Sequence, residues 1–165
     1  MLIAIGLLLP FITGQVPEIG NMLLPMHIPV MLAGLVCGWH YGGLVGFITP
    51  LLRSVIFGKP LLFPSAVAMA FELAAYGLVI GLVFVLLKKK GILSLYISLV
   101  ASMLAGRAVW GIVMWALLVG GKGFTLAAFV SGAFTTAIPG IILQLVLIPA
   151  IMLVLKRAKL VKFED

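Results

Sequence analysis

Long apolar segments, broken by short polar stretches that contain Gly and Pro, fill almost the whole chain. Residues 65–87 and 92–119 are each long enough to cross a bilayer, for which a helix needs about 20 apolar residues. Only 9% of the 165 residues are charged, against about 25% in an average soluble domain, so the chain cannot cover a water-facing surface. The sequence therefore predicts an integral membrane protein.

The spacing of the apolar segments predicts an all-α protein with six transmembrane helices in one compact bundle, a single transmembrane domain over residues 1–165. The expected helices are 1–12, 26–38, 42–57, 65–87, 92–119 and 131–155, with a short turn at 39–41 between the second and the third. The first apolar segment is much shorter than the roughly 20 residues that a span needs, so we expect helix 1 to be truncated at its start.

Basic residues at the ends of the apolar segments predict the orientation, because cytoplasmic loops carry an excess of Lys and Arg. Three lysines occupy 88–90, and four basic residues lie within 156–162 after the last segment. In a six-helix arrangement both groups lie on the same side of the membrane. We therefore expect both termini in the cytoplasm and the loops near 13–25, 58–64 and 120–130 on the outside.

Several function classes are excluded by the kinds of residue that the sequence offers. The net charge of +7 comes from basic residues at segment ends, where topology and contact with the lipid bilayer explain it better than nucleic acid. No Cys/His cluster has metal-ligand spacing, and no Gly-rich loop ending in Lys and Ser or Thr is present to hold ATP. We expect no catalytic residue, no metal and no cofactor bound by this chain.

Three ionisable residues, Arg53, Glu72 and Arg107, lie within the apolar segments. A charge at the centre of a spanning helix costs roughly 2.5–3.5 kcal/mol, so each needs a partner, a cavity or a ligand. One interpretation is an ion pair of Glu72 with Arg107 or Arg53 that staples the bundle. The other is contact with a polar ligand, since two Arg and one Glu leave a positive charge that an anionic or strongly hydrogen-bonding ligand could offset. Arg53 and Glu72 lie nearer the outer face, so we predict that they contact or support the ligand above Arg107, their structural partner.

Uncharged polar and aromatic side chains at similar depth extend this candidate site. Tyr76 follows the membrane carboxylate by one turn, and Trp110 follows the deeper arginine by three residues, so both could stack on a planar ligand. Gln144 and His27 could donate or accept hydrogen bonds to the same ligand. Contact between helices is the alternative for Gln144, and an interfacial position is the alternative for His27.

Glycines recur every four residues through the second and third segments, at Gly34, Gly38, Gly42 and Gly46. This spacing of small residues lets helix backbones approach closely in lipid. Close helix packing is the expected role, and a glycine-lined path for a ligand is the alternative.

Four stretches together form a pattern of known type. They are Leu-Pro-Met-His-Ile-Pro-Val-Met-Leu-Ala-Gly-Leu-Val-Cys-Gly at 24–38, its continuation at 41–53, Phe-Pro-Ser-Ala-Val-Ala-Met-Ala-Phe-Glu-Leu-Ala-Ala-Tyr-Gly at 63–77, and Ala-Ile-Pro-Gly at 137–140. In order and spacing they resemble the substrate-binding S components of energy-coupling factor (ECF) transporters. The resemblance implies a multi-pass protein of the bacterial cell membrane that binds a vitamin or vitamin precursor from outside. It also implies docking on a membrane coupling protein and two ATPase subunits, which use the ATP.

The resemblance also suggests a substrate class and a docking surface. The pattern is closest to members for hydroxymethylpyrimidine or pyridoxine; pantothenate is the alternative, and a membrane scaffold without transport activity is the alternative from another class. Family members dock through an Ala-x-x-x-Ala pair in helix 1, and here Ala4 is followed at that spacing by Leu8 in place of the second Ala, so the pair is incomplete. We expect Ala4 and Leu8, with Gly34 and Gly38, at the contact with partner subunits.

Overall fold

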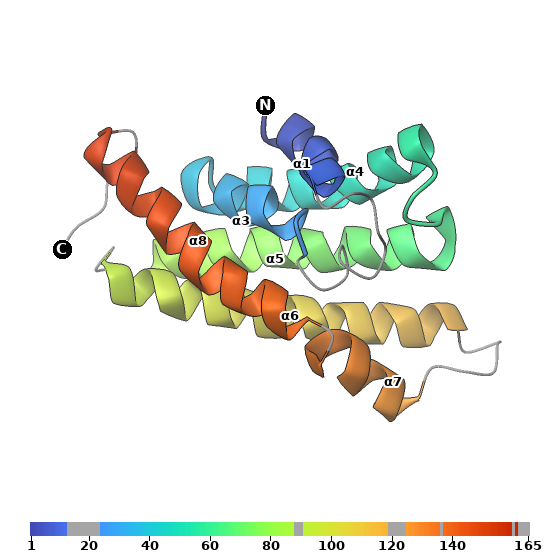
Figure 1. Cartoon of the computed structure of the whole chain (residues 1–165). Helices are drawn as coiled ribbons and strands as arrows, with labels where there is room; N and C mark the ends of the chain where they lie inside the picture. Colours follow the sequence, from blue (N-terminus) through green and yellow to red (C-terminus); the bar gives the residue numbers. More distant parts are fainter. Residues whose placement is uncertain (13–23, 88–90, 119–124, 136, 160, 162–165) are drawn as a thin grey trace.

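A computed structural model describes residues 1–12, 24–87, 91–118, 125–135, 137–159 and 161 of the chain. Within these residues the fold is entirely helical, as predicted (Figure 1). The six longer helices are α1 (Leu2–Ile12), α3 (His27–Val36), α4 (Trp39–Phe57), α5 (Val67–Leu86), α6 (Ile92–Leu118) and α8 (Ile138–Arg157). Shorter elements are the π-helical turns η1 (Leu62–Ala66) and η2 (Ser131–Thr135) and the helix α7 (Leu126–Val130).

Length and composition allow three of the described helical stretches to cross a membrane: Leu62–Leu86, Ile92–Leu118 and Ile138–Arg157. Large apolar side chains such as Leu93 and Val146 are exposed on their outer faces. Such faces suit lipid tails, because helices satisfy their own backbone hydrogen bonds and can present apolar side chains to the bilayer. The protein is an all-α membrane protein, as the sequence predicted.

Two predicted boundaries are wrong. The turn expected at 39–41 is already helical, because α4 begins at Trp39 and the chain reverses one residue earlier. Gly38 makes this reversal possible with a φ of +99°, a conformation that glycine adopts without steric cost. The last long helix begins at Ile138 rather than at Ser131, with a proline in its first turn, where the fixed φ of proline suits a helix start.

Only some of the basic residues and loops that predicted the membrane orientation lie in the described part of the chain. Lys156 and Arg157 lie in the last turn of α8, at the end of the bundle where α3 and α5 also finish (Figure 1). The lysines at 88–90, Lys162, residues 13–23 and residues 120–124 lie outside the described residues, whereas the end of the loop predicted near 120–130 forms the short helix α7.

Small residues hold α3, α4 and α5 close together. A Cβ atom at Gly34 would lie 2.5 Å from the carbonyl oxygen of Gly77, and one at Gly42 would lie 2.6 Å from the Cα of Gly34. Gly46 faces the backbone of α5 in the same way, whereas nothing lies within 4 Å of the position that a Cβ would take at Gly38. Close helix packing is therefore confirmed as the role of three of the four regularly spaced glycines.

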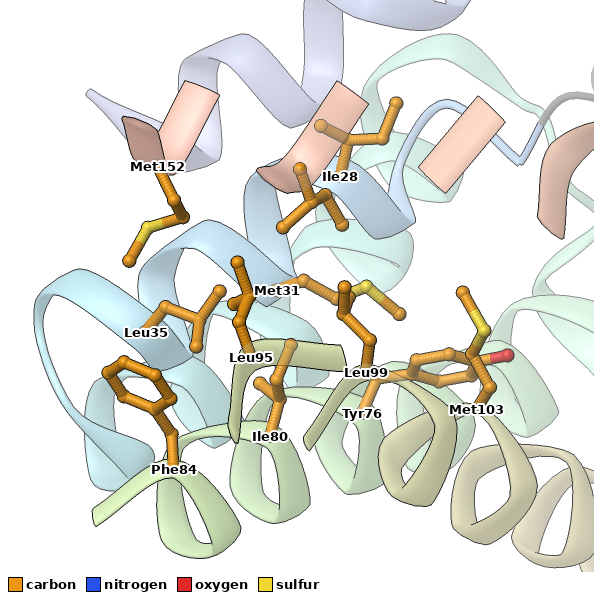
Figure 2. Close-up of a cluster of buried hydrophobic side chains, with 11 residues drawn as sticks. Ile28, Met31, Leu35, Tyr76, Ile80, Phe84, Leu95, Leu99, Met103 and Met152 are labelled. Carbon is orange, nitrogen blue, oxygen red and sulfur yellow. The ribbon is translucent and has the colours of Figure 1, made fainter. Parts of the chain in front are cut away.

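A cluster of buried apolar side chains fills the space between α3, α5, α6 and α8 (Figure 2). Its members are Ile28, Met31, Leu35, Tyr76, Ile80, Phe84, Leu95, Leu99, Met103, Ile148 and Met152. Figure 2 shows Tyr76 and Met103 at one end of this apolar cluster and Leu35 and Phe84 at the opposite end. The end of the apolar cluster that contains Tyr76 faces the side of the bundle on which α3, α5 and α8 begin and α6 ends.

Candidate functional site

Beyond that end of the apolar cluster, the next turn of each of the four helices carries a polar residue. These residues are His27 on α3, Glu72 on α5, Arg107 on α6 and Gln144 on α8. Each lies four residues, about one helical turn, from a member of the apolar cluster on its own helix, which are Met31, Tyr76, Met103 and Ile148. Helix α6 runs opposite to the other three helices (Figure 1). The polar residue precedes its apolar neighbour on α3, α5 and α8 and follows it on α6. All four polar residues therefore fall on the same side of the apolar cluster.

These four residues and Tyr76, which we call the polar cluster, are inaccessible from outside the bundle. The exposed fractions are 1% for His27, 2% for Glu72 and 6% for Arg107, and Tyr76 and Gln144 are fully buried. Burying so many polar groups is unfavourable unless each is hydrogen-bonded or paired. The contacts of the cluster therefore decide what it can do.

An ion pair lies at the centre of the polar cluster. Arg107 donates a hydrogen bond from Nη1 to Oε1 of Glu72 over 2.8 Å, and both side chains are buried. His27 Nε2 lies 3.4 Å from the same carboxylate oxygen. Of the two ion pairs considered from the sequence, the one between Glu72 and Arg107 is thus confirmed.

Tyr76 connects this ion pair to the apolar cluster below it. Its ring packs edge-on against the imidazole of His27, with centroids 4.8 Å apart and an interplanar angle of 90°. Its hydroxyl is close enough to Glu72 and Arg107 to interact electrostatically with both, but it forms no hydrogen bond of good geometry. The ring is therefore held by packing, and its hydroxyl lies next to the ion pair.

Six buried polar atoms of the cluster have no hydrogen-bond partner. They are Nδ1 of His27, the hydroxyl oxygen of Tyr76, Nε and Nη2 of Arg107, and both amide atoms of Gln144. In the described part of the chain, every buried side-chain nitrogen or oxygen without a partner belongs to this cluster. Each such atom costs about 1–3 kcal/mol, and native proteins contain few of them. Their concentration at one end of one core is typical of a site that binds a polar molecule.

Arg53 lies apart from the polar cluster. Its Nη1 donates a hydrogen bond to the carbonyl oxygen of Leu7 over 2.7 Å, so it ties α4 to α1. Its guanidinium lies over the rings of Phe11 and Phe57, at 5.3 and 5.6 Å from their centroids. The alternative ion pair of Arg53 with Glu72 is not formed, and a ligand contact by Arg53 stays a prediction.

Trp110 also makes contacts outside the polar cluster. It is half-buried and stacks on Phe129 of α7, with ring centroids 6.1 Å apart and an interplanar angle of 23°. A Cβ at Gly132 would lie 3.1 Å from the same indole, so Trp110 packs α6 against the segment that precedes α8. Stacking of Trp110 on a ligand stays a prediction.

The residues expected at partner contacts are divided between surface and interior. Ala4 is exposed and Leu8 is 61% exposed, both on α1, whereas Gly34 is buried against the backbones of α4 and α5. Gly38 is partly exposed at the turn before α4. Docking through Ala4 and Leu8 stays a prediction, and Gly34 is not accessible to another protein in this structure.

The aromatic partners of Arg53 and Trp110 were not predicted from the sequence. Phe57 lies four residues after Arg53 on the same helix, a spacing that brings two side chains together and could have indicated the contact. Phe11 and Phe129 come from other helices, so no local pattern links them to their partners. In the described part of the chain no group of three or more His, Cys, Asp or Glu side chains could hold a metal ion.

Comparison with known protein families gives a match that covers nearly the whole chain. The model of the family "ECF transporter, substrate-specific component" matches residues 1–152. No curated protein and no solved structure matches the chain. With all but the last 13 of the 165 residues covered, the chain belongs to the ECF transporter substrate-specific component family.

Proposed function

We propose that this ECF substrate-specific subunit captures a vitamin or vitamin precursor in the polar cluster and hands it to an ECF module for uptake. The observation that carries the proposal is the set of six buried, unpartnered polar atoms at one end of the four-helix core. Membership of the family supports a substrate-binding transporter subunit rather than an enzyme. The energy then comes from ATP used by partner subunits, a membrane coupling protein and two ATPases.

A hydroxymethylpyrimidine-like or pyridoxine-like molecule is the proposed substrate. Such a ring carries nitrogen and hydroxyl groups around a flat apolar body, which suits Gln144 and Arg107 at its edges and Tyr76 beside it. Pantothenate is the alternative, since its carboxylate could meet Arg107. A scaffold without transport activity is the second candidate, favoured by the ion pair that links α5 to α6.

The proposed direction of uptake follows from the basic residues at the opposite end of the bundle. Lys156 and Arg157 end α8, whereas the polar cluster lies near the start of that helix. Basic residues favour the cytoplasmic side, so this orientation places the buried cluster in the half of the bundle that is nearer the outside of a bacterial cell membrane, with both termini in the cytoplasm.

Thermal unfolding of the purified protein tests the proposal with a panel of vitamins and precursors. A ligand at 100 times its Kd stabilises a protein by about 2.7 kcal/mol, which for a chain of this size raises Tm by about 5–10 °C. Tyr76→Phe removes one unpartnered hydroxyl and is expected to weaken binding about tenfold. Tyr96→Phe is the matched control, because Tyr96 is 39% exposed at the other end of α6.

Two outcomes separate the candidates. Stabilisation by one member of the panel, reduced in Tyr76→Phe and unchanged in Tyr96→Phe, supports substrate capture at the polar cluster. No stabilisation by any compound at saturating concentration, with no ATPase subunits copurifying, contradicts transport and favours the scaffold.

A further inference from the structure

The charges around the polar cluster balance. Glu72 is the one acidic residue in the described part of the chain, and its carboxylate is paired with Arg107. Arg53, which the sequence analysis counted as a second positive charge at this site, binds a carbonyl of α1 instead. The cluster therefore contains one negative and one positive charge, which cancel.

His27 does not change this balance when its imidazole is neutral. It is 1% exposed, and a second positive charge beside a single carboxylate would leave a net charge buried in an apolar core. A neutral ring that donates from Nε2 to the carboxylate of Glu72, 3.4 Å away, has Nδ1 as an acceptor.

The unpartnered atoms define which hydrogen-bond donors and acceptors a ligand must carry to satisfy them. Nε and Nη2 of Arg107 are donors only, so the ligand must present lone pairs to them. Gln144 has one free donor group and one free acceptor, and the hydroxyl of Tyr76 can act as either. The ligand must therefore carry several acceptors and at least one donor group.

The free edge of Arg107 has a geometry that also fits a carboxylate, so charge must decide between an acid and a neutral molecule. A ligand carboxylate on that edge would share one guanidinium with Glu72, and the buried group would carry a net negative charge. An uncompensated buried charge is strongly unfavourable, whereas neutral acceptors such as ring nitrogens, hydroxyls or amides keep the balance. We infer that this site selects an uncharged ligand with adjacent hydrogen-bond donors and acceptors, and rejects the corresponding carboxylic acid; the inference rests on the proposed function.

Matched pairs of compounds that differ in charge test this selectivity. The probes are nicotinamide with nicotinate, pantothenol with pantothenate, and pyridoxine with 4-pyridoxate, each titrated against the full-length protein in detergent. For every pair that binds, the neutral member is expected to bind at least tenfold more tightly than the acid. Tighter binding of the acid overturns the inference but leaves the proposed function intact, whereas no binding of any of the six compounds, of hydroxymethylpyrimidine or of any other member of the vitamin panel overturns both.

A charge change at the site gives a second, independent readout. Glu72→Gln keeps an oxygen for His27 and Arg107 but gives the cluster a net positive charge, so the preference for the neutral member should fall at least tenfold or reverse. Arg157→Met removes an exposed positive charge at the opposite end of α8 and should leave the preference within twofold. An unchanged preference in Glu72→Gln contradicts the inference, and if that variant does not fold the wild-type pairs remain decisive.

Discussion

The ion pair between Glu72 and Arg107 should be coupled strongly enough to measure. At 2.8 Å and an effective dielectric constant of about 20, two unit charges attract by about 6 kcal/mol, part of which offsets the cost of burying them. Removing one partner leaves the other charge buried and unpaired, which costs about 3–5 kcal/mol. Removing both leaves no such charge, so the double variant should be at least as stable as either single variant.

A double-mutant cycle with Glu72→Gln and Arg107→Met measures this coupling. Gln at 72 retains an oxygen that can accept from His27, so the cycle changes the charge while that neighbour keeps a partner. The free energy of unfolding is measured by titrating sodium dodecyl sulfate into protein in mild detergent, with circular dichroism as the signal. We expect a coupling energy of about 3 kcal/mol or more.

A control cycle pairs Glu72→Gln with Arg53→Met. Arg53 binds Leu7 and has no contact with Glu72, so the two effects should add within about 0.5 kcal/mol. If the Glu72–Arg107 cycle is additive within the same margin, the pair does not hold α5 to α6, and the reasoning on the charge balance of the site is refuted.

Three further predictions concern packing, the α1 contact and the cost of the site. Gly34→Ala should lower the free energy of unfolding by about 1–3 kcal/mol, because the new methyl meets the backbone of Gly77, whereas Val85→Ala on an exposed face should change it by less than about 0.5 kcal/mol. Arg53→Ala should increase hydrogen exchange in α1, since the lost hydrogen bond from a charged group is worth about 1.5–3 kcal/mol; a ligand Kd weakened tenfold or more would show that Arg53 also belongs to the binding site, and an unchanged Kd would exclude it. Gln144→Leu should raise Tm without ligand, because it removes two unpartnered polar atoms, and should abolish the rise on adding ligand; lower ligand-free stability would mean that the amide is a structural contact.

Much of the architecture follows from local patterns in the sequence. Apolar segment length predicts the number and type of the helices, because a bilayer imposes both the span and internal hydrogen bonding. The four-residue spacing of Gly42 and Gly46 predicts a close seam, since positions at that spacing share a helix face, whereas Gly34 lies on the preceding helix and meets Gly42 only in the folded bundle. The boundary at residues 39–41 was predicted wrongly because a positive φ at Gly38 allows a tighter reversal than a three-residue turn.

The sequence also determined which polar and charged residues must be buried at a cost. A charged or amide side chain within an apolar segment is expensive whatever its neighbours are, so Arg53, Glu72, Arg107 and Gln144 could be singled out without coordinates. All four are indeed buried. Burial cost is a property of each residue and its segment, and therefore it can be predicted from the sequence.

Only the tertiary structure decided which of these residues belong together. Glu72 lies 19 positions from Arg53 and 35 from Arg107, yet it pairs with the more distant arginine. The choice depends on how α4 and α6 are rotated against α5 and on what else each face meets, such as the carbonyl of Leu7. Pairing between helices is a property of packing. The sequence suggested a site with excess positive charge, and only the folded bundle shows that the site contains one negative and one positive charge, which cancel.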